Sequence, residues 1–470
     1  FDQKIQATIA ASVGDRLKFN MTYNTDATFD FDSKNLKLSY EGKEDDIVKN
    51  IEAGNVSMTT GSSLIRGSTA LFSVKTKLQF GKLTATALVS QQNSESKSVS
   101  SRGGAQTTKF TVNADEYDQN RHYFLGQFFR EHYDEFASKL PLVTSGINIT
   151  RIEVWITNKS NRFDQSRNIV AFMDLGEENR LASDHWVPNP QYPNPANASN
   201  NLLASIKADY PGARQISTVT QALEPLAAYD IEGGRDYEKV ESARLLSSNE
   251  YTLNPTLGYI SVRSALNADE VLAVAYEYTY RGQVYQVGEF SGDITTTDQS
   301  LYVKMLKSTT VAPRLPMWDL MMKNVYNLGG YQVQKNKFKL NIKYLSDTTG
   351  TAINYLPVPG INNKPILQLM NLDRLDSNQE SNSDGFFDFI EGYTIIPSTG
   401  KVIFPVVEPF GSNLRKVIGN DMEAEKYVYQ ELYDSTLIVA RQFADKNKFI
   451  LEGEYQASSG SQIRLNAMNV

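Results

Sequence analysis

Residues 120–158 (NRHYFLGQFFREHYDEFASKLPLVTSGINITRIEVWITN) contain one of the few clearly helical hydrophobic patterns in the chain. Leu125, Phe129, His132, Phe136 and Leu140 recur at helical spacing, which predicts an amphipathic helix that ends at Pro141. The residues that follow alternate in polarity and predict a strand, because successive side chains of a strand point to opposite faces. Long hairpins are predicted before this helix–strand unit, and small β-rich modules after it. The apolar positions of the strand are Ile147, Ile149, Ile152, Val154 and Ile156.

Length and composition limit the class of protein. A chain of 470 residues is expected to form about three or four domains. It has no cysteine, which excludes disulfides, thiolate catalysis and zinc-finger sites. A net charge of −7 without a basic cluster argues against a nucleic-acid partner. The sequence contains no apolar run of about 18 residues, so it predicts no transmembrane helix. The first residues, FDQKIQATIA, lack the pattern of a signal peptide, so we expect a mature fragment.

Two segments near the N-terminus predict long β-hairpins. Residues 3–25 alternate around a Gly14-Asp15 turn, and residues 70–90 alternate around a Gly81-Lys82 turn. Each arm of the second hairpin has about the 9–11 residues that a tilted strand needs to cross a bilayer, whereas soluble strands average about 5–6 residues. The alternation alone also fits an amphipathic sheet of a soluble protein.

Weaker patterns lie elsewhere. Residues 39–58 contain an acidic cluster at 44–46 followed by Ile47 and Ile51, which suggests a short helix with an acidic first turn. Residues 245–293 predict a β-meander. The segment LNPTLGYISV (253–262) is similar to IIPSTGKVIF (395–404), which suggests a weak internal repeat.

No residue pattern predicts an active site, so we expect a protein that is not an enzyme and uses no cofactor. His122, His132 and His185 are the only histidines, and none has a zinc-protease or Ser-His-Asp context in the sequence. We expect His132 to pack on the helical apolar face.

The segment DRLDSNQESNSDG (373–385) invites a calcium-loop interpretation because Asp376, Asn378 and Glu380 fall at alternate positions. It departs from the pattern where Ser381 replaces the glycine of the turn and Phe387 replaces the bidentate glutamate. An acidic surface loop is the preferred interpretation, and no metal site is predicted.

Six stretches of the chain are similar to sequences of one family. They are EGKEDDIVKNIEAGNVSM, STALFSVKTKLQFGKLTATALVSQQ, QNRHYFLGQFFREHYDEF, ITRIEVWITN, MWDLMMKNVYNL and DGFFDFIEGYTIIPSTGKVIFPVVEPFG. Together they resemble the SprA (Sov) proteins, which are outer-membrane translocons of the type 9 secretion system in the Bacteroidota. The resemblance extends over essentially all of the chain, and family members are several times longer.

The resemblance implies a mainly β fold, part of a very large transmembrane β-barrel with inserted β-rich and α+β modules. It implies a pore that passes folded cargo with C-terminal signal domains to the cell surface and supports gliding motility. The implied partners are a PorV-type outer-membrane barrel, a periplasmic plug protein, secreted cargo, outer-membrane lipid and the remainder of the same chain. We expect hairpins of the barrel wall at 1–118, a helix–strand insertion at 119–200, and β-rich modules at 201–330 and 331–470.

In such a barrel, alternation assigns the two faces of the 70–90 hairpin. The predicted lumen-facing residues are Lys75, Lys77 and Gln79. The predicted lipid-facing residues are Phe72, Val74, Leu78, Phe80, Leu83, Ala85, Ala87 and Val89.

Two other classes of protein remain as alternatives. A soluble or surface-attached adhesin or carbohydrate-binding protein could be built from the same Tyr-rich β modules. A hydrolase on a β scaffold is disfavoured by the absence of a catalytic pattern, although paired carboxylates distant in sequence would escape this search.

Overall fold

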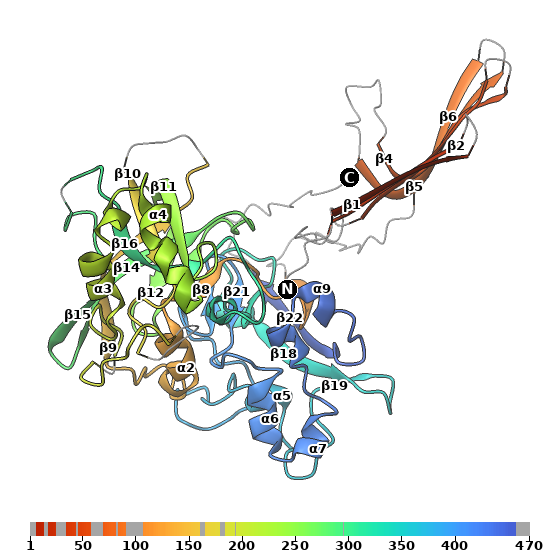
Figure 1. The fold of residues 1–470 in the computed structure, drawn as a ribbon. Helices are drawn as coiled ribbons and strands as arrows, with labels where there is room; N and C mark the ends of the chain where they lie inside the picture. The colour runs from red at the N-terminus through yellow and green to blue at the C-terminus, as the bar shows by residue number, and fades with distance from the viewer. Residues whose placement is uncertain are drawn as a thin grey trace. The chain divides into compact units, whose positions relative to one another are not determined.

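The computed structural model describes residues 6–13, 17–24, 34–43, 46–57, 69–80, 83–90, 107–159, 165–178, 184–192, 194–294 and 296–456. The fold is mainly β, as predicted (Figure 1). The chain separates into two compact units, one formed by residues 1–101 with 464–470 and the other by residues 102–463. How the second unit divides into modules stays a prediction, although residues on both sides of position 200 share one of its sheets.

The first unit contains a six-stranded antiparallel sheet in which each strand pairs with the next along the chain. Both predicted hairpins are confirmed as strand pairs, β1 with β2 and β5 with β6. Their turns at 14–15 and 81–82 lie outside the described residues. The strands are Gln6–Val13 (β1), Leu17–Asn24 (β2), Lys34–Glu41 (β3), Val48–Ser57 (β4), Thr69–Phe80 (β5) and Leu83–Ser90 (β6).

The helix suggested within residues 39–58 is wrong. Residues 48–57 form strand β4, in which Ile51 pairs with Thr76 and Ala53 pairs with Val74 of β5. Ile51 and Ala53 alternate with Asn50 and Glu52, and this period of two is that of a strand. Residues 44 and 45 lie outside the described part.

A small closed barrel of five strands forms the centre of the second unit. Strand β14 pairs with both β16 and β9, so the order β14-β16-β10-β11-β9 returns to β14. All its neighbours are antiparallel except β10 and β16, and β15 extends the sheet beyond β14. The strand predicted over residues 147–156 is confirmed as β9. The bounds are Ile147–Ile156 (β9), Ser166–Phe172 (β10), Tyr237–Leu245 (β11), Leu272–Tyr280 (β14), Gln283–Val287 (β15) and Leu301–Lys307 (β16).

The central helix is shorter than predicted. It spans Gln127–Phe136 (α2), and the residues before it form a strand, His122–Phe124 (β8). Strand β8 pairs with β13, and Tyr123 also bridges to Met321. The partners of β8 lie far away in the sequence, and pairing with them overrides the local helical pattern that included Leu125. His132 packs as predicted, between the rings of Phe128 and Phe136.

The suggested internal repeat is present as two hairpins with the same geometry. Each hairpin turns at a glycine with positive φ, Gly258 or Gly400, a conformation that glycine adopts without steric cost. Leu125 N–H donates to the Gly258 carbonyl at 3.0 Å, and Leu328 N–H donates to the Gly400 carbonyl at 2.9 Å. The paired strands are Tyr251–Asn254 (β12), Tyr259–Val262 (β13) and β8 in one copy, and Ile395–Ile396 (β20), Lys401–Ile403 (β21) and Val325–Asn327 (β17) in the other.

The predicted meander at 245–293 is therefore only partly correct. Its last two strands, β14 and β15, form a hairpin around Arg281 and Gly282, both with positive φ. Strand β13 instead pairs with β8 in the separate repeat sheet.

A further sheet holds the two ends of the second unit. Its order is β19-β18-β22-β7, and Thr107 at the start of β7 pairs with Gln456 at the end of β22. The chain thus enters and leaves this unit on neighbouring antiparallel strands. The strands are Thr107–Asn113 (β7), Lys339–Leu345 (β18), Ala352–Ile353 (β19) and Phe449–Gln456 (β22).

Short helices surround these sheets (Figure 1). The α-helices are Leu202–Asp209 (α3), Val219–Leu223 (α4), Ile366–Leu369 (α5), Ser412–Ile418 (α6), Asp421–Ala424 (α7), Glu431–Asp434 (α8) and Leu437–Ala440 (α9); the 3-10 helices are Pro211–Arg214 (η1), Glu224–Tyr229 (η2), Pro316–Leu320 (η3) and Lys335–Lys337 (η4).

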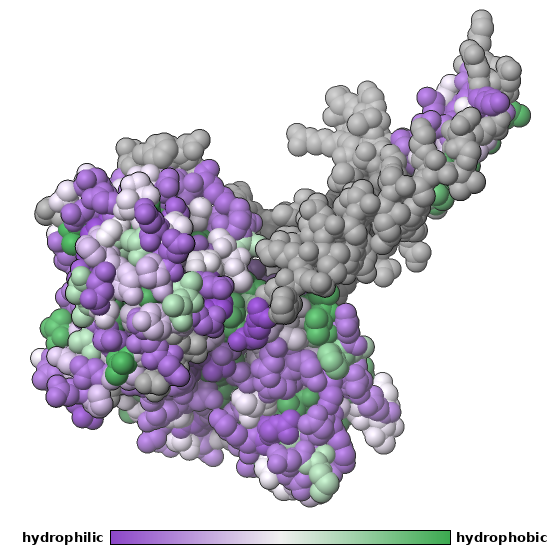
Figure 2. Space-filling model, in the orientation of Figure 1, coloured by the Kyte–Doolittle hydropathy of each residue, from purple (hydrophilic) through white to green (hydrophobic). Residues whose placement is uncertain are grey.

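The surface of the second unit is mostly hydrophilic on the face that Figure 2 shows, with apolar residues scattered singly. Such single residues are normal for a protein surface. Within the described ranges, no helix is both long enough and apolar enough to cross a membrane.

Candidate functional site

The six-stranded sheet places apolar and polar residues in alternate rows that cross all of its strands. Residues that pair directly across neighbouring strands form rows. One row consists of Ala11, Phe19, Leu38, Ala53, Val74 and Val89. A second row, two residues away along each strand, consists of Val13, Leu17, Tyr40, Ile51, Thr76 and Ala87. The row between them runs Ser12, Lys18, Ser39, Glu52, Lys75 and Leu88. Direct partners share a face, so the register separates an apolar face from a polar face.

The described side chains of β5 and β6 agree with these two faces. Val74, Phe80 and Leu83 are 43%, 54% and 67% exposed, although all three are large and apolar. Ala85 and Ala87 are exposed on the same face, and Leu78 is half-buried there. The apolar face therefore lacks the cover that such side chains usually have in water.

The opposite face carries the charged residues. Lys75 pairs with Glu52 of β4 at 3.4 Å, while Lys77 and Gln79 are exposed. The register thus brings together each predicted set, although which set contacts lipid stays a prediction. Phe72 and Val89 occupy strand positions, opposite Asn55 and Val74, but their side chains lie outside the described ones.

A Ser-His-Asp cluster lies in the second unit, although no local sequence motif predicted one. His122 of β8 is fully buried; its Nε2 contacts Asp118 Oδ2 at 2.8 Å and its Nδ1 contacts Ser261 Oγ at 2.7 Å. Burial lowers the pKa of His122, so the ring is neutral at pH 7. Its partners indicate that Nε2–H donates to Asp118 and that Nδ1 accepts from Ser261.

The carboxylate of this cluster is strongly stabilised. Burial alone raises the pKa of Asp118, but the hydrogen bonds and charges of His122 and Lys401 lower it to about 2. Lys401 belongs to β21, so this ion pair joins the second copy of the repeat to the segment that precedes β8. Arg121 lies 3.2 Å from the same carboxylate.

The internal repeat argues that this cluster is structural. His122 and Ser261 are direct cross-strand partners, and the equivalent positions in the second copy hold Val325 and Ile403. A polar pair therefore occupies a position that an apolar pair also fills. His122 and Ser261 are both buried, and neither lines the two cavities described below. The 139-residue separation of the two side chains explains why the sequence did not reveal the cluster.

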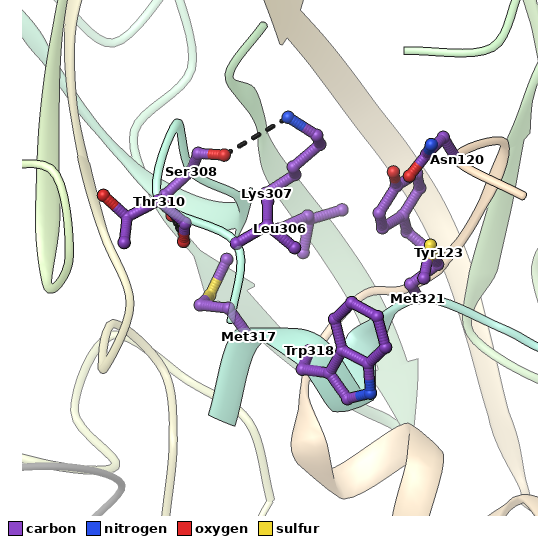
Figure 3. A pocket seen from close by; sticks show the side chains of 10 residues that line it. Asn120, Tyr123, Leu306, Lys307, Ser308, Thr310, Met317, Trp318 and Met321 are labelled. Atoms are coloured by element: carbon purple, nitrogen blue, oxygen red, sulfur yellow. Dashed lines mark hydrogen bonds between the residues drawn. The ribbon is translucent and has the colours of Figure 1, made fainter. Parts of the chain in front are cut away.

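A small cavity lies beside this cluster, between β16, η3 and the start of β8 (Figure 3). Its volume is about 20 Å³, enough for about one water molecule. Tyr123 and Trp318 form part of its wall, and the Tyr123 hydroxyl has no hydrogen-bond partner among the described residues. Burial raises the pKa of this phenol. The cavity is too small for a substrate.

Metal chemistry finds no support in the described ranges either. They contain no group of three or more His, Cys, Asp or Glu side chains that could hold a metal ion. The acidic loop 373–385 uses its carboxylates in a different way, which is described below.

The sequence model of the SprA N-terminal family, described as a motility related/secretion protein, matches residues 1–265. This is more than half of the chain and includes all six strands of the first unit. The chain belongs to the SprA family. No curated protein matches it. The resemblance found in the sequence is thus confirmed over residues 1–265, and this SprA-family chain is a motility- and secretion-related protein.

Proposed function

We propose that this SprA-family chain forms part of the pore subunit of the type 9 secretion translocon in the outer membrane. The observation that carries the proposal is the row pattern of the β1–β6 sheet, with an exposed apolar face and a polar face. Strands β4 and β5, with 10 and 12 residues, reach the length that a tilted strand needs to cross a bilayer. Consecutive antiparallel pairing is also the connectivity of outer-membrane barrels.

In this proposal the apolar face contacts outer-membrane lipid and the polar face lines the lumen. Lys75, Lys77 and Gln79 face the lumen, whereas Val74, Leu78, Phe80 and Leu83 face lipid. The outer edges of β1 and β6 have no strand partner in the described part of the chain. An unpaired strand edge in lipid costs several kcal/mol per backbone group, so the wall is completed by the remainder of the same chain.

The second unit is an insertion between wall strands in this proposal. The pairing of Thr107 with Gln456 supports it, because a unit whose entry and exit lie side by side fits into a loop without disturbing its host. Conduction of folded cargo to the cell surface is passive and the chain is not an enzyme. A PorV-type barrel, a periplasmic plug protein and cargo with C-terminal signal domains are its proposed partners.

Membrane fractionation of the tagged parent protein tests the proposal. We expect the protein in the outer-membrane fraction, resistant to a urea or carbonate wash and released by detergent. Release by the wash alone would contradict a wall role for β1–β6. That result would favour the alternative of a surface-attached adhesin.

A further inference from the structure

The acidic loop 373–385 is held together by its own carboxylates. Asp373 is fully buried and accepts hydrogen bonds from Ser383 Oγ at 2.6 Å and from the amides of Asp384 and Gly385 at 3.0 and 3.1 Å. Asp376 Oδ1 accepts from the amides of residues 378 and 380 at 2.9 and 3.0 Å. These acids serve the loop backbone, as Asp side chains commonly do in turns.

The two ends of the loop are also fixed. Asp388 Oδ2 accepts from the amides of Arg374 and Leu375 at 2.7 and 3.2 Å. The Arg374 guanidinium donates from Nη1 to the carbonyl of Ser138, which follows α2. The loop is therefore a preformed wall, since its conformation is set by hydrogen bonds at its start, middle and end.

This wall, together with α5 and α6, lines an open cavity of about 480 Å³. That volume lies within the range of about 300–1,000 Å³ typical of ligand pockets. Leu369 of α5 and Val417 of α6 supply apolar surface, and Gln368 and Asn382 supply amides.

The charged side chains that line the cavity differ in how many hydrogen-bonding groups remain available to a ligand. Arg374 keeps further N–H groups beyond the one that donates to Ser138. The ammonium of Lys364 makes no side-chain hydrogen bond or ion pair to the described residues, and this side chain is exposed. The carboxylate in the wall, Asp373, is fully buried and accepts three hydrogen bonds from its own loop. The lining groups left to bind a ligand are therefore the two cations and the amides.

We propose that this cavity binds a carboxylate-bearing ligand through Lys364 and Arg374, with the remainder of the ligand between the amides and the apolar surface. Charge-assisted hydrogen bonds to a carboxylate are the strongest contacts these side chains offer. Two sources carry this chemistry, an acidic side chain of a peptide segment and an acidic sugar. Such a site goes beyond the secretion role of the family, because it gives the second unit a recognition function of its own.

Ligand-observed NMR on the detergent-solubilised full chain tests this site. The peptide probe is N-acetyl-glutamate amide, with N-acetyl-glutamine amide as its neutral counterpart. The sugar probe is galacturonate, with galactose as its neutral counterpart. We expect at least one acidic probe to bind about tenfold more tightly than its neutral counterpart. Binding of only one acidic probe identifies the source, and binding of both identifies the carboxylate itself as the recognised group.

Two charge-reversal variants provide the matched comparison. Lys364→Glu changes the cavity, and Lys337→Glu makes the same charge change on an exposed lysine of η4 that does not line it. We expect Lys364→Glu to weaken binding of the acidic probe about tenfold and Lys337→Glu to leave it unchanged. Equal effects of both variants would overturn the proposal. Equal binding of acidic and neutral probes, or no binding at about 10 mM ligand, would also overturn it.

Discussion

The two main β structures of this SprA-family chain differ in how far their side chains are buried. In the small barrel of the second unit, every residue of β16 is buried, including Lys304 and Lys307. In the sheet of the first unit, Val74, Phe80 and Leu83 share one face and all are exposed. Burial of apolar surface is the main favourable term in folding. The barrel therefore carries its own core, whereas none of the described side chains of the sheet is buried.

This difference indicates that the two units depend on different surroundings. The barrel strands close on themselves and are packed by helices and loops of the same unit. The exposed apolar side chains of β5 and β6 need an apolar environment, which water does not supply. We therefore expect substitutions in the second unit to change its stability in water, and substitutions in the first unit to change membrane insertion.

The largest expected effect is in the second unit, at a buried ion pair. Lys304 Nζ lies 2.6 Å from Glu177 Oε1, both side chains are almost fully buried, and the same oxygen accepts the Gln127 amide at the start of α2. Glu177→Ala leaves a buried ammonium unpaired and is expected to cost about 3–5 kcal/mol. Urea unfolding followed by tryptophan fluorescence measures this loss, because all three tryptophans lie in the second unit.

The double variant Glu177→Leu with Lys304→Met is the control. Replacing both charges by apolar side chains is expected to restore most of the lost stability. A loss below about 1 kcal/mol in Glu177→Ala would show that the pair does not hold the helix to the barrel.

The second effect separates the units. Val74→Arg puts a charge on the apolar face of β5 and is expected to cost about 2–4 kcal/mol of insertion near the bilayer midplane. Lys77→Arg, on the polar face of the same strand, is the matched control and should insert normally. Insertion is measured as the fraction of wash-resistant protein in the outer membrane. Wild-type insertion of Val74→Arg would show that this face does not contact lipid.

A third effect concerns pH and is confined to the second unit. Burial lowers the pKa of His122 below the ordinary value of about 6.5, so below that pH the unfolded chain binds a proton that the folded chain does not. Stability is therefore lost as pH falls through about 6.5, by at most about 1.4 kcal/mol per pH unit. Urea unfolding of wild type and His122→Gln between pH 7.5 and pH 5.5 checks this. We expect the variant to lose less stability over that range, and parallel curves would refute the role of His122.

The smallest effect is expected at Tyr123. Its buried hydroxyl has no partner among the described residues, so Tyr123→Phe removes a polar atom without breaking a bond (Figure 3). The change in unfolding free energy should be neutral or stabilising by up to about 1 kcal/mol. A loss of more than about 1 kcal/mol in unfolding free energy would mean that a water molecule in the adjacent cavity binds this hydroxyl.

Local patterns in the sequence predicted the parts of the fold that depend on local periodicity. The hairpins at β1–β2 and β5–β6, the strand β9 and the repeated glycine turns follow from alternation and from turn residues. The start of α2 did not, because β8 is held by pairing with Ser261 and Met321, far away in the chain. The His122 cluster was missed for the same reason.

The function of individual charges was equally hard to predict. An acidic surface loop was preferred over a calcium loop for 373–385, but the sequence did not reveal that Asp373 and Asp376 bind backbone amides of their own loop. Ligand and turn roles require the same side chains in a loop, so the sequence alone does not separate them. The faces of β5 and β6 were assigned by alternation, and the register groups the same residues.

Single-cysteine labelling along β5 and β6 tests whether one face of this sheet contacts lipid and the other faces water. The chain has no cysteine of its own, so each introduced thiol reports one position. A membrane-impermeant maleimide is applied to outer-membrane vesicles that carry cysteine at position 74, 75, 77, 78, 79, 80, 83 or 85. We expect labelling at 75, 77 and 79, because these positions face a water-filled lumen in the proposal. We expect protection at 74, 78, 80, 83 and 85, because these positions face lipid. Equal labelling at all eight positions would contradict the assignment of this sheet to a membrane wall.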